Sequence, residues 1–137
     1  MAQVSFDELL AKREQREKDR LKVGNIPVPG TDKYLIVKMP TDSKMLDLFG
    51  KFVISYRDSD MGNLLRMSDE AIYACCEQLQ DKKLRESLGV SDPLDVVPAL
   101  FTVPERNEMS ESILQFLGLL KTDEDDSGDT IDNPAKN

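Results

Sequence analysis

The stretch YLIVKMPTDSKMLDLFGKFVISYR, residues 34–57, contains two different patterns of apolar residues, one typical of a strand and then one typical of a helix. Its first part, residues 34–39, is rich in strand-favouring residues and lies between turn-forming residues, which predicts a β-strand. From residue 42 the apolar residues recur every three or four positions, which predicts a helix over 42–57 capped by Thr41 or Asp42. We expect its apolar face to lie in the core: Met45, Leu48, Phe49, Phe52, Val53 and Tyr56.

Residues 23–28 precede this strand and can pair with it in a β-hairpin over 23–39. The two segments are joined by Pro-Gly-Thr-Asp at 29–32, a combination typical of turns. Pro27 would confine the first strand to a sheet edge, because proline donates no ladder hydrogen bond. A two-stranded ribbon is marginal alone, so helices are expected behind it.

Residues 1–22 form a charged segment, and residues 5–22 within it have the pattern of a helix. Ser5 followed by Glu8 is a capping box, which marks the start of the helix. Few of its residues are apolar, so a stably buried position is excluded. We expect a charged helical arm that is either solvated or ordered by a partner. Its apolar residues are Phe6, Leu9, Leu10 and Leu21.

Further helices are expected downstream. Ser68 can cap a helix that runs to about Lys82, with a possible continuation over 83–88 ended by Gly89. Asp92–Pro93 is a plausible start of a short helix, and residues 105–120 have the period of a last one. The predicted inward residues are Ile72, Cys75, Cys76 and Leu79 in the first of these, and Met109, Ile113, Phe116, Leu117 and Leu120 in the last. The adjacent cysteines are interpreted as reduced, partly buried thiols, because a disulfide between neighbours would be strained.

The length of 137 residues favours one domain, and the net charge of −8 is concentrated at its end. Residues 122–137 carry one basic and six acidic residues, and Ile131 is their one large apolar residue. They cannot offset the cost of ordering their backbone, so a disordered acidic tail is expected. The predicted fold is therefore mainly α. It has an arm over 1–22, a helical domain with a hairpin over 23–121 and a tail over 122–137.

The sequence lacks the residues that several classes of function require. The chain has no histidine and no nucleophile-elbow, phosphate-loop or dinucleotide motif, so we expect no catalytic residues and no cofactor. Asp123, Asp125 and Ser127 begin like a calcium-binding loop, but Pro134 stands where the loop needs glutamate, so no metal is expected. There is no basic stripe for nucleic acid and no apolar run of about 20 residues for a membrane. A cytoplasmic location is expected.

Binding to another protein is the function that this composition leaves open. The apolar face at the end of the last predicted helix is wide, and part of it is a candidate contact with another chain. The candidate partner-binding residues are Phe116, Leu117, Leu119 and Leu120, and, in the arm, Phe6, Leu9 and Leu10. For each residue the alternative is an ordinary place in the core.

A resemblance to a known family rests on three features. They are the charged first helix, the segment NIPVPGTDKYLIVKMP before a helical body, and Ala135-Lys136-Asn137, whose permitted codons include GCA AAA AAC, on which a ribosome can slip. In these the chain resembles the tail assembly chaperones of long-tailed bacteriophages. The resemblance implies a small helical protein that coats the tape measure protein in the host cytoplasm and is absent from the virion. It also implies self-association and a longer, frameshifted form.

A second class of function stays open beside this one. A small acidic helical protein can be an adaptor or inhibitor that binds a single enzyme, with the acidic tail as the active element in imitation of nucleic acid. Deletion of 122–137 separates the two classes. The deletion would abolish an electrostatic mimic and would leave client binding by a chaperone intact.

Overall fold

The computed structural model describes residues 2–121, and the tail predicted at 122–137 lies outside the described residues. Within the described part, the predicted mainly helical fold with an antiparallel hairpin near the N-terminus is confirmed. The elements, in chain order, are α1 (Phe6–Asp19), β1 (Val23–Pro27), β2 (Tyr34–Lys38), α2 (Asp42–Arg57), α3 (Met61–Cys75), the 3-10 helix η1 (Glu77–Gln80), α4 (Lys82–Leu88), the 3-10 helix η2 (Pro93–Asp95), α5 (Val96–Leu100) and α6 (Val103–Phe116).

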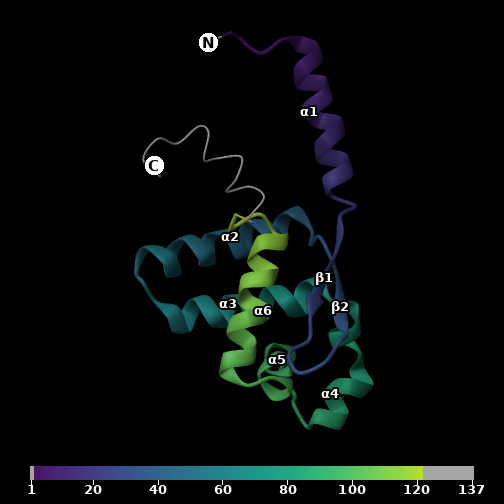
Figure 1. Cartoon of the computed structure of the whole chain (residues 1–137), viewed down its shortest axis with the longest axis vertical. Helices are drawn as coiled ribbons and strands as arrows, with labels where there is room; N and C mark the ends of the chain where they lie inside the picture. The colour runs from purple at the N-terminus through teal and green to yellow at the C-terminus, as the bar shows by residue number, and fades with distance from the viewer. Residues whose placement is uncertain (1, 122–137) are drawn as a thin grey trace.

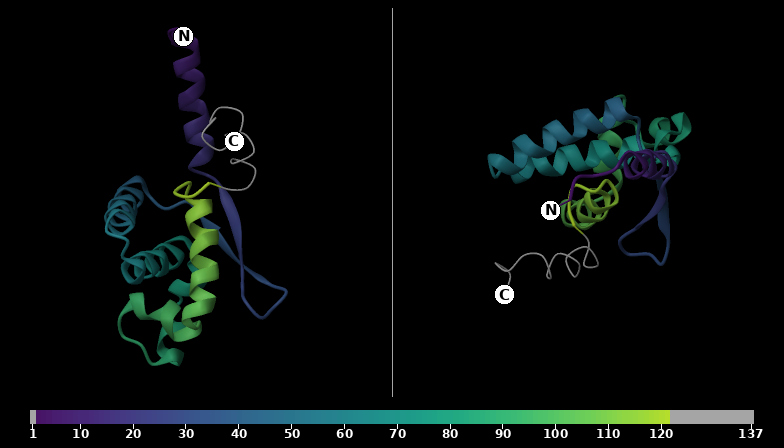
Figure 2. Two further views of the ribbon diagram at one scale, coloured as in Figure 1. Left: turned by 60° about the vertical axis from the view of Figure 1, so that its left-hand side comes forward. Right: turned by 90° about the horizontal axis from the view of Figure 1, so that it is seen from above.

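Helix α3 is the centre of the body. It packs antiparallel to α2 on one side and is crossed by α6, while the hairpin lies along α6 (Figure 1). Helices α4 and α5 lie at the end of the body that is opposite to α1 (Figure 1). Helix α1 extends away from all of these, and the tip of the hairpin also projects from the body (Figure 2). The body therefore has one core, and the arm stands outside it.

The core joins the hairpin to the helices. Ile26 and Val37 point inward from the two strands, whose register pairs Gly24 with Val37 and Ile26 with Leu35. They meet fully buried residues of α2, α3 and α6, among them Leu48, Ile72, Met109, Ile113 and Leu114. The predicted inward positions Ile72, Cys75, Cys76 and Leu79 are confirmed as buried, and both thiols are free.

Helix α2 begins and ends as predicted, and Thr41 caps it by accepting a hydrogen bond from the Lys44 amide. The prediction for its apolar face is half wrong. Leu48 is buried, but Phe49 is 49% exposed and Tyr56 is 65% exposed, and Val53 is also exposed. The reason is that α2 packs mainly on α3, so one neighbour covers only a strip of a face that is wider than that contact.

The predicted start of the next helix at Ser68 is wrong. Helix α3 begins two turns earlier, where the Asp60 carboxylate accepts a hydrogen bond from the Asn63 amide at 3.0 Å. Ser68 is a buried interior residue whose Oγ lies 2.6 Å from that of Ser110 on α6. The helix also ends before Lys82, at Cys75. There the side-chain Nε2 of Gln80 donates to the carbonyl of Tyr73 and satisfies one of the carbonyl groups at the helix end.

Helix α4 is a separate helix, and it ends at Gly89 as predicted, in the left-handed region at φ 72°. Helix α6 is shorter than the predicted 105–120. Thr102 and Glu105 form a capping box at its start, and it ends at Phe116. Gly118 then turns the chain at φ 80°, and the amides of Leu119 and Leu120 donate to the Leu114 carbonyl. The residues after Phe116 are therefore a C-terminal cap that folds back on the core.

Candidate partner-binding surfaces

A cleft with a volume of about 800 Å³ opens between the α2–α3 pair and the segment formed by η2 and α5. Its apolar lining comes from four elements of the body. Ile54 of α2 is 54% exposed and Leu94 of η2 is 47% exposed. Pro98 of α5 and Met67 of α3 also line the cleft, although Met67 is only 3% exposed. We call these four residues the cleft lining. Apolar side chains that are as exposed as Ile54 and Leu94 within a concave site are typical of a contact with another molecule.

One wall of the cleft is a buried ion pair between α3 and α6. The Arg106 guanidinium donates two hydrogen bonds to the Asp69 carboxylate, one of them from Nε to Oδ1 at 3.1 Å. Both side chains are largely shielded from solvent. The hydrogen bond that Arg106 donates to Asp69 is the main cause of a raised pKa of Arg106, so the guanidinium stays charged. A bidentate pair of this kind fixes the two helices relative to each other.

A second ionic cluster forms the rim on the α2 side. Lys51 Nζ lies 2.8 Å from Glu70 Oε1 and 3.2 Å from Asp47 Oδ2, and Lys44 also contacts Glu70. The hydrogen bond with Glu70 is the main cause of a raised pKa of Lys51, and the hydrogen bond with Lys51 lowers the pKa of Asp47. The charges of Lys44, Lys51, Asp47 and Glu70 therefore compensate one another. The apolar lining is the part of the cleft that can bind an apolar partner.

The volume of the cleft is comparable to that of a short helical segment. An α-helix is about 10 Å wide and rises about 5.4 Å per turn, so 800 Å³ corresponds to roughly two turns. An amphipathic helix could place its apolar residues on the cleft lining and its polar residues against the charged rim. Arg66, on the cleft wall, and Asp95, on the η2 side, offer charges of both signs for such contacts.

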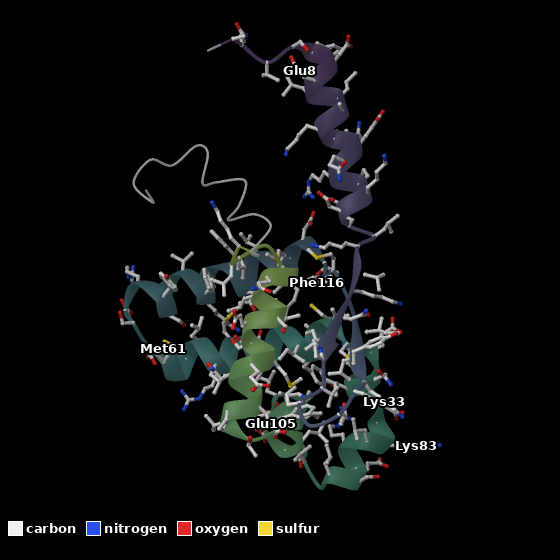
Figure 3. All side chains as sticks on the ribbon, viewed as in Figure 1. Glu8, Lys33, Met61, Lys83, Glu105 and Phe116 are labelled. Atoms are coloured by element: carbon white, nitrogen blue, oxygen red, sulfur yellow. The ribbon has the colours of Figure 1, made fainter. Side chains whose placement is uncertain are left out.

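The predicted arm exists as α1, with the predicted capping box: the Glu8 amide donates to Ser5 Oγ at 3.1 Å. None of its residues is buried. Phe6 is 70% exposed, and Leu9 and Leu10 are also exposed. Figure 3 shows Glu8 at the far end of the arm, away from the body. These predicted residues are therefore accessible, and their binding to a partner stays a prediction.

The base of the arm is attached to the body. Arg16 and Arg20 each donate to Asp42 Oδ2, at 2.9 and 2.7 Å, where α2 begins. The Lys22 amine donates to the carbonyl of Phe116 at 3.2 Å. These exposed contacts join the base of the arm to the body, while the apolar end of the arm remains uncovered.

The predicted residues at the end of α6 are mostly occupied inside the fold. Phe116 lies beside the hairpin, where its ring packs against Gly24 and the Lys22 amine is 5.1 Å from the ring centre (Figure 3). Leu117 is 6% exposed and belongs to the core, and Leu119 and Leu120 are half-buried against it. The structure does not bring these four residues together with Phe6, Leu9 and Leu10 at the apolar end of the arm. The four residues also expose less surface than the sequence predicted.

The sequence did not predict two exposed apolar surfaces of the body. The cleft could not be found, because its lining comes from separate elements. The other surface is the outer face of α2, which we call the α2 stripe: Leu46, Phe49, Val53 and Tyr56, all exposed. Three of these were predicted as core. The width of the apolar face on the helix was the available signal, since one neighbouring helix does not cover so wide a face.

No protein-family model, curated protein or solved structure matches the chain. Within residues 2–121, no group of three or more histidine, cysteine or acidic residues is placed to hold a metal ion. None of the described helices is both long enough and apolar enough to cross a membrane.

Proposed function

We propose that the chain is a non-enzymatic tail assembly chaperone of a long-tailed bacteriophage, which binds the tape measure protein by taking helical segments of it into the cleft. The observation that carries the proposal is the exposed apolar lining of the cleft, headed by Ile54 and Leu94. A cleft of this volume with an exposed apolar lining accepts a short amphipathic helical segment better than a small polar ligand.

The physical requirement for such a chaperone is to cover apolar helix surface and to keep the complex dissolved. Apolar surface removed from water contributes about 25 cal/mol per Å². Each copy covers only a short segment, so many copies would act along one long client. Each copy has a net charge of −8, so two coated complexes repel each other. This repulsion keeps the coated client in solution.

The remaining parts of the proposal follow the family resemblance. Phe6, Leu9 and Leu10 of the arm are a second contact site, for the client or for another copy. Leu119 and Leu120 contribute through the part of their surface that is exposed. A longer frameshifted form of the chain acts beside the short one, in the cytoplasm of the bacterial host, and neither form stays in the mature virion.

Co-expression with the tape measure protein of the same phage tests the proposal. The soluble fraction of the client is measured with the wild-type chain, with Ile54→Glu and with Leu94→Glu. Val103→Glu is the matched control, because Val103 is an apolar residue outside the cleft that is at least as exposed as Ile54 and Leu94. We expect the client to be soluble with the wild type and the control, and to precipitate with either cleft variant. Equal solubility without the chain would refute the proposal.

The second candidate is an adaptor or inhibitor of a single enzyme, favoured by the six acidic residues in 122–137. Deletion of these residues distinguishes the candidates. A chaperone that uses the cleft keeps its client soluble without them, whereas an electrostatic mimic loses its activity.

A further inference from the structure

Gly50 is a half-buried residue in the middle of α2, where glycine costs stability. A glycine inside a helix is less favourable than alanine by about 1 kcal/mol. Its backbone is helical, and a Cβ built on it would have nothing within 4 Å. The described fold therefore gives no reason for a residue without a side chain at this position. Close approach of another backbone is a reason that the fold itself does not contain.

Gly50 borders the α2 stripe. Leu46, Phe49, Val53 and Tyr56 follow one another at spacings of three, four and three residues. This spacing places them in one row along the helix, the arrangement through which two helices pack side by side. Gly50 stands next to Leu46 and Val53 on the helix surface, so it provides a shallow place for a second helix against that row.

We propose that the α2 stripe is a self-association surface and that its occupant is α2 of a second copy, in antiparallel orientation. Asp42 precedes the stripe by one helical turn, and Arg57 directly follows its last residue. The midpoint between them falls at Phe49 and Gly50. An antiparallel pair centred there places Asp42 of each copy beside Arg57 of the other, whereas a parallel pair would place like charges together.

The two charged groups are available for this contact. Arg57 pairs with Asp58 at 3.1 Å, but both side chains are more than half exposed, so that pair can be exchanged at little cost. Asp42 is also exposed, and it accepts from Arg16 and Arg20 through one of its two oxygens, Oδ2. Its other oxygen can accept a further donor.

The size of the surface predicts a weak dimer. The four stripe residues are between 41% and 72% exposed. Because an aromatic side chain buries roughly 150–250 Å², the stripe offers on the order of 400 Å² per copy, or about 800 Å² in total. Stable complexes bury roughly 1,200–2,000 Å², so the dimer should form only at high concentration. Copies held side by side on one client would have such a concentration locally. The dimer itself does not depend on the identity of that client.

Sedimentation of the full chain over a wide range of concentration tests this proposal. The wild type should change reversibly from monomer to dimer. Phe49→Glu should weaken dimerisation at least about tenfold, because it puts a charge at the centre of the contact. Gly50→Leu should do the same by blocking the close approach, although leucine favours the helix and its Cβ would meet nothing within 4 Å in the monomer. Val103→Glu, on another helix, should dimerise like the wild type.

Orientation is tested by exchanging charges. Arg57→Asp alone should weaken the dimer, and Arg57→Asp together with Asp42→Arg should restore it. A wild type that stays monomeric at every concentration would overturn the proposal, and so would a dimer that survives both Phe49→Glu and Gly50→Leu. Variants of the stripe that lose client binding without any change in self-association would assign the surface to the client instead, and would equally overturn it.

Discussion

Gly24 of β1 and Phe116 of α6 touch so closely that any side chain at position 24 would force one of them to move: a Cβ built on Gly24 would lie 2.6 Å from Cδ1 of the Phe116 ring. This contact attaches the hairpin to the last helix. It also explains why Phe116, a candidate for partner binding by sequence, is engaged inside the fold.

Gly24→Ala should therefore destabilise the protein. The added methyl group forces the Phe116 ring or the strand to move, and overpacking of this kind typically costs about 1–3 kcal/mol. Urea unfolding measures the change. Gly50→Ala is the matched control, because the Cβ there meets nothing, and it should stabilise the helix by up to about 1 kcal/mol. Equal effects of the two substitutions would contradict the packing described here.

Removal of one partner of the Asp69–Arg106 pair should be costly. Arg106→Leu leaves the Asp69 carboxylate buried without its donors, and such a loss is worth about 3–5 kcal/mol. The double variant Asp69→Leu with Arg106→Leu should recover most of the loss, because no charge is left uncompensated. Lys82→Ala, which removes an exposed pair with Glu86, should change the unfolding free energy by less than about 0.5 kcal/mol. A small effect of Arg106→Leu would show that the pair is not buried in solution.

Cys75 makes stability depend on alkaline pH. Burial, with a smaller effect of Cys76, raises the pKa of its thiol from 9.0 to about 12. Below pH 9 the thiol is protonated in both the folded and the unfolded chain, so its contribution is fully present. Between pH 9 and 12 the unfolded chain loses this proton and the folded chain keeps it, so the unfolding free energy falls. The difference between the wild type and Cys75→Ala should shrink over this range, as measured by urea unfolding. A constant difference would argue against a buried thiol.

The capping box should control the arm without affecting the body. Ser5→Ala removes the acceptor of the Glu8 amide, and loss of such a cap costs a helix about 1 kcal/mol. Because no residue of α1 is buried, this loss should speed hydrogen exchange of the α1 amides and leave the urea midpoint of the body unchanged. A shifted midpoint would mean that the arm packs on the body after all.

Local signals in the sequence were sufficient where one or two residues decide the outcome. The capping box of Ser5 and Glu8, the cap at Thr41 and the end of a helix at Gly89 are all present as predicted. Ser68 misled because its hydroxyl, which could have capped a helix, instead lies 2.6 Å from the hydroxyl of Ser110 inside the body. A hydroxyl of this kind looks the same in sequence whether it caps or packs.

The surfaces depend on tertiary contacts that no local pattern contains. Phe49 and Leu48 are neighbours with the same apolar character, but only Leu48 faces α3. Ile54 and Leu94 are 40 positions apart and become one surface only when η2 packs beside α2 and α3. The sequence therefore indicated that apolar surface was available and did not indicate where it lay.

Hydrogen exchange of the full chain, alone and bound to the tape measure protein, tests the central claim most directly. If the client lies in the cleft, amides around Ile54 in α2, Met67 in α3 and Leu94 in η2 should gain protection on binding, while the hairpin formed by β1 and β2, which does not line the cleft, should not change. Protection confined to the arm, or to the region of Phe116, would contradict the account.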